Sequence, residues 1–153
     1  MSLRVRRLAP GDEAILELLA REDADFDLAE RGEPLAPLSP EAARDYLADP
    51  HVLHWIAEQG GVILGHLYCA VVRKRAADPL EVLLYEIGVR AAHRRRGVGR
   101  ALMAVLDEWI AEHQIIESWV LADNADAVAF YRACGFVDGE PPVYLVRPDP
   151  AEE

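Results

Sequence analysis

The sequence predicts one mixed α/β domain built around a single sheet, and three observations support this class. The chain has 153 residues, which suffices for one well-buried core but not for two domains. Apolar runs with strand character alternate with runs of helical period in the order β-α-α-β-β-β-α-β-α-β. A turn rich in arginine and glycine at residues 94–99 joins one strand to a long helix. We assign residues 1–148 to the domain and 149–153 to a short C-terminal tail.

The first third of the chain is expected to contain one strand and two helices. Residues 3–8 form the first strand, and Asp12 is placed to cap a helix that runs to about residue 22. Residues 23–38 are acidic and contain two prolines and a glycine, so we expect an irregular loop or a short helix. The Ser-Pro-Glu sequence that begins at residue 39 has the order that helix starts prefer, and it predicts a second helix to about residue 48.

The middle of the chain is expected to form three strands and a long helix. Residues 51–58 and 62–72 alternate like strands and are joined by Gln-Gly-Gly, which indicates a hairpin. Residues 80–89 are apolar on both faces, as expected of a central strand. Residues 97–113 carry an apolar stripe at helical spacing, which predicts a helix packed on the sheet.

The last third is expected to hold a strand, a short helix and the end of the sheet. Residues 116–122 form an apolar strand, and residues 124–134 form a helix that Gly135 ends. Residues 136–146 are predicted to supply one or two further strands around a Pro-Pro pair.

Composition and charge exclude several classes of protein. The net charge of −11 argues against a nucleic-acid partner, which would require a basic face. The sequence has no apolar run of the roughly 20 residues that a membrane span needs and no secretory signal. Its two cysteines therefore indicate a reduced, cytoplasmic protein. Residues 11–49 hold twelve acids and three arginines, which either solubilise one face or attract a cationic acceptor.

The turn at residues 94–99 is suited to bind an anion. The first backbone N–H groups of a helix have no partner inside the helix, and the helix dipole adds partial positive charge there. Gly97 and Gly99 have no Cβ, so a phosphate could approach the main chain. Four arginines surround this point: Arg94, Arg95, Arg96 and Arg100. The alternative is an exposed basic turn without a ligand.

Two motifs resemble those of the GNAT acetyltransferases. Arg94-Arg95-Arg96-Gly97-Val98-Gly99 is similar to the loop with which that family grips the pyrophosphate of acetyl-CoA. Asn124-x-x-Ala127-x-x-Phe130-Tyr131, followed by Gly135-Phe136, resembles the second signature of the family. The resemblance implies a central, mostly antiparallel sheet of six or seven strands flanked by about four helices. Residues 84–102 look most like the aminoglycoside 3-N-acetyltransferase branch. The polar connection at residues 73–79 and the acidic loop at residues 23–38 share this resemblance.

The resemblance implies a role for each matching residue. The backbone of residues 87–89 would pair with the pantetheine arm, the amides of residues 95–101 would hold the pyrophosphate, and Asn124 would hydrogen-bond the cofactor. Tyr131 would lie near the cofactor sulfur. The full set of implied acetyl-CoA contacts is Ile87, Gly88, Val89, Arg94, Arg95, Arg96, Gly97, Val98, Gly99, Arg100, Ala101, Asn124, Ala127, Phe130 and Tyr131.

The chemistry of acetyl transfer to an amine makes its own demands. An alkylamine with a pKa near 10 is mostly ammonium at neutral pH, so it must lose a proton before it attacks a thioester. Glu86 is the only charged residue between Val82 and Val89, and we predict that it is the base. Tyr131 is the predicted acid for the leaving thiolate. Glu86 could instead be paired with Arg90 or a loop arginine, and Tyr131 could be a core aromatic.

Gly88 lies in the middle of an apolar strand, which predicts a bulge or a close approach of another backbone segment. A main-chain N–H close to this glycine could stabilise a developing oxyanion. The acidic loop supplies the predicted acceptor contacts, which are Asp23, Asp25, Asp27 and Glu30.

Three functions follow from these residues. The leading one is acetyl-CoA-dependent N-acetylation of a small cationic amine, such as an aminoglycoside-like aminosugar or a polyamine, by direct attack. The alternatives are a protein or peptide N-acetyltransferase and a non-catalytic module that binds acyl-CoA. The five histidines lack the spacing of metal ligands, so no metal is expected. GNAT proteins often pair through their C-terminal strands, which leaves a homodimer open.

Overall fold

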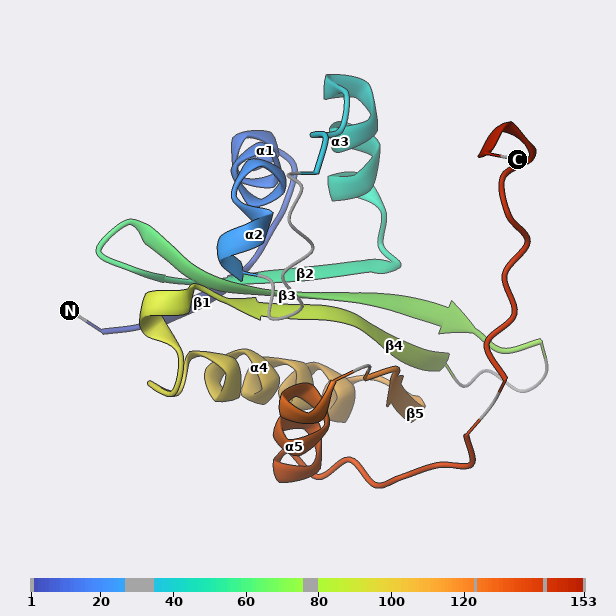
Figure 1. The fold of residues 1–153 in the computed structure, drawn as a ribbon. Coiled ribbons are helices and arrows are strands. Elements are labelled where there is room, and N and C mark those ends of the chain that lie inside the picture. Colours follow the sequence, from blue (N-terminus) through green and yellow to red (C-terminus); the bar gives the residue numbers. More distant parts are fainter. Residues whose placement is uncertain (1, 27–34, 76–79, 123, 142, 153) are drawn as a thin grey trace.

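Five strands form the sheet at the centre of the molecule, in the order β1-β2-β3-β4-β5 (Figure 1). The computed structural model describes residues 2–26, 35–75, 80–122, 124–141 and 143–152. The pairs β1–β2, β2–β3 and β3–β4 are antiparallel, and the pair β4–β5 is parallel. The strands are β1 (Arg4–Arg7), β2 (Val52–Gln59), β3 (Val62–Arg73), β4 (Leu80–Val89) and β5 (Ile115–Val120).

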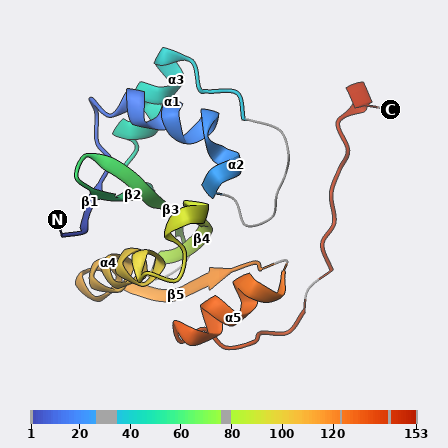
Figure 2. The ribbon, with the colours of Figure 1, turned by 60° about the vertical axis from the view of Figure 1, so that its left-hand side comes forward.

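Helices cover both faces of this sheet (Figures 1 and 2). On one face lie α1 (Glu13–Arg21), α2 (Asp23–Phe26) and α3 (Pro40–Ala48), and on the other lie α4 (Val98–Glu112) and α5 (Ala125–Ala133). Each face has its own apolar core, with Phe26 and Ile56 buried beneath the first group and Leu102 and Leu106 beneath the second. The mixed α/β class is therefore confirmed.

Local sequence explains where α3 and α5 begin, but the predicted cap of α1 is wrong in its contact: Asp12 lies at the N-cap position, and its carboxylate binds Arg6 and the Ala9 N–H instead of the helix amides. The Ser39 hydroxyl accepts a hydrogen bond from the Ala42 N–H at 3.2 Å, and Pro40 opens α3. The Asn124 side chain caps α5 in the same way, accepting from the Ala127 N–H at 2.8 Å. Gly135 follows α5 with φ of 99°, a left-handed conformation that glycine adopts without strain.

The prediction of further strands in residues 136–146 is wrong. The described part of this segment is irregular and extends away from the sheet (Figure 1), so the described residues form five strands and not six or seven. The side chains of Val143, Tyr144 and Leu145 are 80%, 81% and 85% exposed. Strand propensity acts only where a partner strand is available, and the prolines at 141 and 142 offer no N–H to a ladder. Asp138 is held instead by Arg132 at the end of α5, at 2.6 Å.

Candidate active site

A bulge divides β4 into two halves with different neighbours. Leu84 lies opposite Cys69 and Glu86 lies opposite Tyr68, so Tyr85 is the extra residue. Up to Leu84, β4 is paired with β5, and the recorded pairs between these two strands end there. Beyond the bulge, β3 is the only described strand that pairs with β4, which leaves the other edge of residues 87–89 for an added strand.

The close backbone approach predicted at Gly88 is confirmed. A Cβ built on this residue would lie 2.8 Å from the Phe26 carbonyl oxygen and 3.3 Å from His66 Nε2. Only glycine therefore allows the Phe26 carbonyl of α2 and the His66 ring of β3 to pack this closely against β4. The bulge itself lies three residues earlier, at Tyr85.

The loop after β4 presents backbone N–H groups at the start of α4. Arg94 Nε donates to the Val89 carbonyl at 3.1 Å, which folds the loop back on the strand. Arg95 has φ of 61° and Gly97 has φ of 84°, both left-handed, a pattern that builds concave anion sites. The first hydrogen bond within α4 runs from the Ala101 N–H to the Gly97 carbonyl at 3.0 Å, so the three preceding amides have no acceptor inside the helix.

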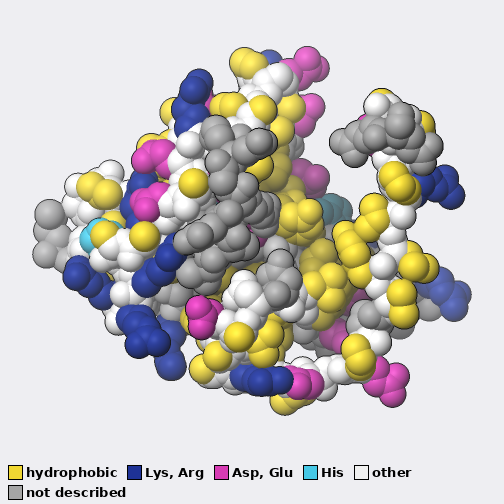
Figure 3. All heavy atoms as spheres, in the orientation of Figure 1, with side chains coloured by type: hydrophobic (Ala, Val, Ile, Leu, Met, Phe, Trp, Pro, Cys, Tyr) yellow, Lys and Arg dark blue, Asp and Glu magenta, His cyan; other side chains and the backbone are white. Residues whose placement is uncertain are grey.

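Charge at this loop favours an anion. The side chains of Arg95, Arg96 and Arg100 are exposed, and His93 and Arg94 are half-buried. Lys and Arg side chains gather on the surface at this end of the molecule (Figure 3). The free amides, the helix dipole and these arginines together could hold a diphosphate.

The second motif packs against this loop. A Cβ on Gly99 would come within 3.2 Å of the Phe130 ring, so α5 lies directly on the first turn of α4. Asn124 uses its carboxamide oxygen to cap α5. Val98, at 4% exposed, and the half-buried Ala127 belong to the apolar core on this face.

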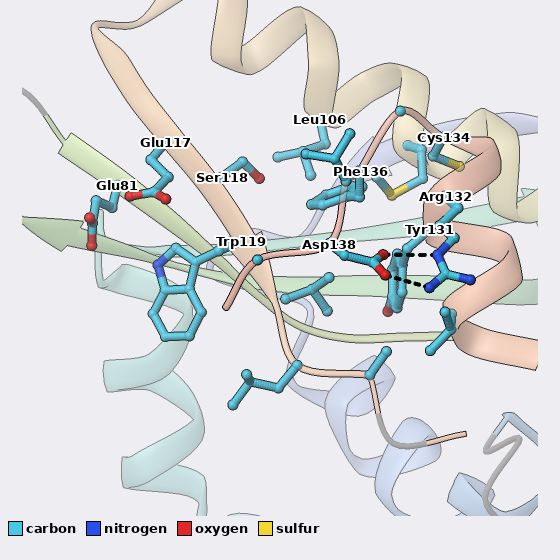
Figure 4. A pocket seen from close by; sticks show the side chains of 18 of the residues that line it. Glu81, Leu106, Glu117, Ser118, Trp119, Tyr131, Arg132, Cys134, Phe136 and Asp138 are labelled. Carbon is cyan, nitrogen blue, oxygen red and sulfur yellow. Dashed lines mark hydrogen bonds and ion pairs between the residues drawn. The ribbon is translucent and has the colours of Figure 1, made fainter. Parts of the chain in front are cut away.

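Tyr131 is a buried aromatic residue, 7% exposed, with Phe130 and Phe136 at ring-centroid distances of 5.5 and 5.6 Å. It also lines a cavity of about 1030 Å³ between α4, β5, α5 and residues 135–141. Figure 4 shows its ring projecting from α5 beside the Arg132–Asp138 ion pair. The structure therefore places this residue in the core and at the cavity wall, and its role as an acid stays a prediction.

The cysteine one turn after Tyr131 has the properties of a packing residue. Cys134 is half-buried, and burial raises the pKa of its thiol; nearby Arg100 lowers that pKa and Asp107 raises it further. A raised pKa keeps the thiol protonated at neutral pH, which disfavours nucleophilic attack. Cys69 is fully buried, and burial raises its pKa to about 12. Both thiols are free.

The acidic residues predicted to contact the acceptor have different environments. Asp25 and Glu22 both bind the Arg90 guanidinium, each at 3.1 Å, and this guanidinium also stacks over the Phe26 ring at 4.5 Å. Asp23 is 5% exposed. Asp27 and Glu30 lie outside the described residues. Arg90 thus ties α1 and α2 to the end of β4, and its single positive charge is shared between Asp25 and Glu22.

Glu86 lies in a cluster that sequence reasoning missed. The rings of Tyr46, Tyr68 and Tyr85 come from α3, β3 and β4, with centroid distances of 5.7 Å for Tyr46–Tyr68 and 5.3 Å for Tyr68–Tyr85. Burial raises the pKa of Tyr46 and of Tyr68, and the nearby Glu86 charge raises both further. In the sequence, the only sign of this cluster is that Tyr68 and Tyr85 lie on two predicted strands. The register that brings these two residues together appears only in the structure.

Two buried histidines continue this cluster into the core. The Tyr46 hydroxyl hydrogen-bonds His54 Nδ1 at 2.8 Å, and His54 Nε2 hydrogen-bonds His66 Nδ1 at 2.9 Å. Burial lowers the pKa of His54 to about 3, with a smaller contribution from His66, and burial lowers the pKa of His66 to about 4. Both rings are therefore neutral at physiological pH.

Comparison with known proteins matches this arrangement to one family. The model of the acetyltransferase (GNAT) family matches residues 14–136. The chain is 35% identical over 100 residues to N-alpha-acetyltransferase RimI of Mycobacterium tuberculosis, covering 65% of this chain but only 61% of RimI.

Solved structures show the same fold. An aminoglycoside acetyltransferase from an uncultured soil metagenomic sample superimposes with a TM-score of 0.80 and 28% identity, over 97% of this chain and 100% of that one. The aminoglycoside N-acetyltransferase AAC(6')-Iy, solved in complex with CoA, has a TM-score of 0.72 at 18% identity, over 95% of this chain and 100% of that one. With the family model matched across both motifs and the full fold shared, the chain belongs to the acetyltransferase (GNAT) family.

Proposed function

We propose that this protein is an acetyl-CoA-dependent N-acetyltransferase that acts on a primary amine of a small cationic acceptor, of aminoglycoside or polyamine type. One observation carries the proposal: the edge of β4 after Tyr85, along which β3 is the only described strand that pairs with it, leads directly to the arginine- and glycine-rich turn before α4, with Glu86 at the start of that edge. An extended thiol arm ending in a diphosphate fits an open strand edge followed by a helix N-terminus.

Two parts of acetyl-CoA, the pantetheine and the pyrophosphate, are proposed to bind along this path. The backbone of residues 87–89 would pair with the pantetheine, and the amides of residues 98–100 with the exposed arginines would hold the pyrophosphate. When bound, acetyl-CoA supplies the acetyl thioester. The soil metagenomic relative and AAC(6')-Iy are both aminoglycoside acetyltransferases by name, which supports an amine acceptor.

Two side chains are proposed to move protons. Glu86, half-buried beside the tyrosine cluster, would accept the proton that the acceptor ammonium must lose before attack. Tyr131 would donate a proton to the departing thiolate, the role that the family resemblance implies; the close contact of its neighbour Phe130 with Gly99, which puts α5 beside the start of α4, supports this. A main-chain N–H near Gly88 would face the developing oxyanion. No acyl-enzyme is needed.

A second candidate is a protein or peptide N-acetyltransferase. The relative RimI is named as an N-alpha-acetyltransferase and is 35% identical over the matched region. A non-catalytic acyl-CoA-binding module is the third candidate. The two enzymatic candidates differ in acceptor only, whereas the third predicts binding without turnover.

Release of CoA thiol from acetyl-CoA tests all three. The purified protein is assayed against aminoglycosides, polyamines, amino acids and short peptides, with a control without acceptor to subtract hydrolysis. We expect turnover with small amines only; turnover confined to peptides would select the second candidate. Acetyl-CoA binding without turnover on any acceptor would select the third. Tyr131→Phe adds a test of the acid: a loss of turnover with an unchanged urea unfolding midpoint supports the role, and full turnover would remove Tyr131 from the mechanism.

The cytoplasmic location and a homodimer are also proposed. Two free thiols support a reducing compartment. In the part of the chain that the structure describes, no helix is both long and apolar enough to cross a membrane. The exposed apolar residues Val143, Tyr144 and Leu145 support self-association, which light scattering of the purified protein would test.

A further inference from the structure

We propose that Tyr46, Tyr68 and Tyr85, with Glu86, form the subsite for the reactive ammonium of the acceptor, and that this subsite selects an ammonium carried on an alkyl chain. The inference rests on the proposed function and deepens it. It favours acceptors of the polyamine type over hydroxylated aminosugars.

The three tyrosines lie in a row, with Tyr85 exposed at the surface and Tyr46 next to the buried His54. Tyr85 is 66% exposed, whereas Tyr68 and Tyr46 are half-buried, and each ring contacts the next at a tilt of about 50°. A large aromatic side chain exposed on a sheet face is not explained by packing in the core.

The bulge in β4 creates this juxtaposition. Across the bulge, Leu84 faces the core under α4 while Tyr85 contacts Tyr68 on the opposite face, and Glu86 lies opposite Tyr68 in the ladder. In a regular strand without this bulge, each residue after Leu84 would pair one position further along β3. Glu86 would then point to the face of α4 and not to the face of Tyr68. The fold thus brings an exposed aromatic ring and a carboxylate together on β4.

The chemistry of this set matches an alkylammonium. A cation within about 6 Å of an aromatic ring centre is attracted by the negative face of the ring, and a neighbouring carboxylate adds direct charge attraction. The apolar parts of the rings favour a hydrocarbon stem, whereas hydroxyl groups on a sugar would lose hydrogen bonds to water there. Asp49 also lies near Tyr68 and adds negative charge.

The buried histidines fix the inner end of the subsite. The Tyr46 hydroxyl is hydrogen-bonded to His54, and His54 is hydrogen-bonded to His66. These two bonds fix the position of the Tyr46 ring beside Tyr68. Because both histidines are neutral, they place no positive charge beside an incoming cation. Tyr46 and His54 are positioning residues in this scheme.

Binding of butyltrimethylammonium, which cannot be acetylated, tests the subsite without turnover. Isothermal titration should show binding to the wild type and much weaker binding of butanol, which has the same stem without the charge. Tyr85→Leu should weaken binding about two- to fivefold, as expected for a cation–π contact at an exposed site, and Tyr85→Phe should not. Tyr68→Leu combined with Tyr85→Leu should weaken it about tenfold or more. Tyr144→Leu, an exposed tyrosine on the C-terminal segment, is the matched control.

The outcomes separate this inference from the proposed function. If the wild type does not bind butyltrimethylammonium, or if Tyr85→Leu and Tyr144→Leu behave alike, the subsite is wrong even where amines are acetylated. A lower KM for aminoglycosides than for alkyl polyamines would overturn the selectivity. Failure of acetyl-CoA to bind would defeat the proposed function, while the ammonium titration would still report on the subsite. Circular dichroism of each variant confirms that it is folded.

Discussion

The ring of Phe130 lies so close to Gly99 that a Cβ on this glycine would come within 3.2 Å of two ring carbons. This contact joins the two motifs that the sequence separates by some thirty residues, and it sets the position of α5 on the first turn of α4. Packing against Phe130 by itself therefore favours a glycine at position 99, independently of the phosphate contact proposed for it.

The first prediction concerns this contact. Gly99→Ala should displace the Phe130 ring by a few tenths of an ångström and weaken acetyl-CoA binding severalfold, with little loss of stability because alanine favours a helix. Binding is measured by titration calorimetry. Phe130→Leu in the same chain should restore part of the affinity, since the smaller side chain leaves room for the methyl group. Equal losses in the single and double variants would show that the contact is irrelevant.

The second prediction concerns the proposed base. Glu86→Gln should reduce kcat about 10²- to 10⁴-fold, the usual contribution of general base catalysis, while acetyl-CoA affinity stays unchanged. Steady-state kinetics and calorimetry measure the two quantities. Glu58→Gln is the control, because Glu58 is a half-buried acid on β2 whose recorded ion pair is with Arg6. Full turnover of Glu86→Gln would remove this residue from the mechanism.

The third prediction concerns Arg90, which joins two helices to the sheet. Its guanidinium binds Glu22, Asp25 and the Ile63 carbonyl and stacks on Phe26. Arg90→Leu should lower the free energy of unfolding by about 1–3 kcal/mol, the sum expected for one hydrogen bond, a cation–π contact and two partly exposed ion pairs.

Urea denaturation measures this loss. Arg132→Leu is the control, since the Arg132–Asp138 pair has both side chains more than half exposed, and it should leave the unfolding midpoint unchanged. An unchanged midpoint for Arg90→Leu would mean that α1 and α2 do not depend on this residue.

The fourth prediction concerns pH. His54 and His66 have pKa values lowered by burial from 6.5 to about 3 and about 4, so the unfolded chain binds more protons than the folded one below pH 6.5. Stability should therefore fall as the pH drops from 6.5 towards 4. At pH 5 the loss is about 2 kcal/mol for each histidine.

Unfolding midpoints between pH 7 and pH 5 test this slope. A variant with glutamine at both His54 and His66 should be less stable at pH 7 but nearly independent of pH in this window. His51→Gln, at an exposed histidine before β2, should keep the wild-type slope. A wild-type protein whose stability is flat between pH 7 and pH 5 would contradict the burial of the pair.

Much of the fold could be predicted because the deciding interactions are local. The caps of α3 and α5 depend on a side chain and an amide three residues apart, the β2–β3 hairpin on two glycines, and the start of α4 on Gly97. Each lies within one turn of chain, so the residue types alone determine the geometry.

Tertiary structure decided the rest because the partners are distant in sequence. The Tyr46–His54–His66 chain and the pairing of Arg90 with Asp25 join residues from different elements, and the bulge at Tyr85 shifts which side chains of β4 share a face. The strand character of residues 136–146 predicted one or two further strands, but a strand also needs a partner strand, and the described residues provide none for this segment. Sequence by itself determined the family, the starts of α3 and α5, and the arginine- and glycine-rich turn before α4. Only the register of the sheet decided which residues surround Glu86, because a shift of one residue exchanges the two faces of a strand.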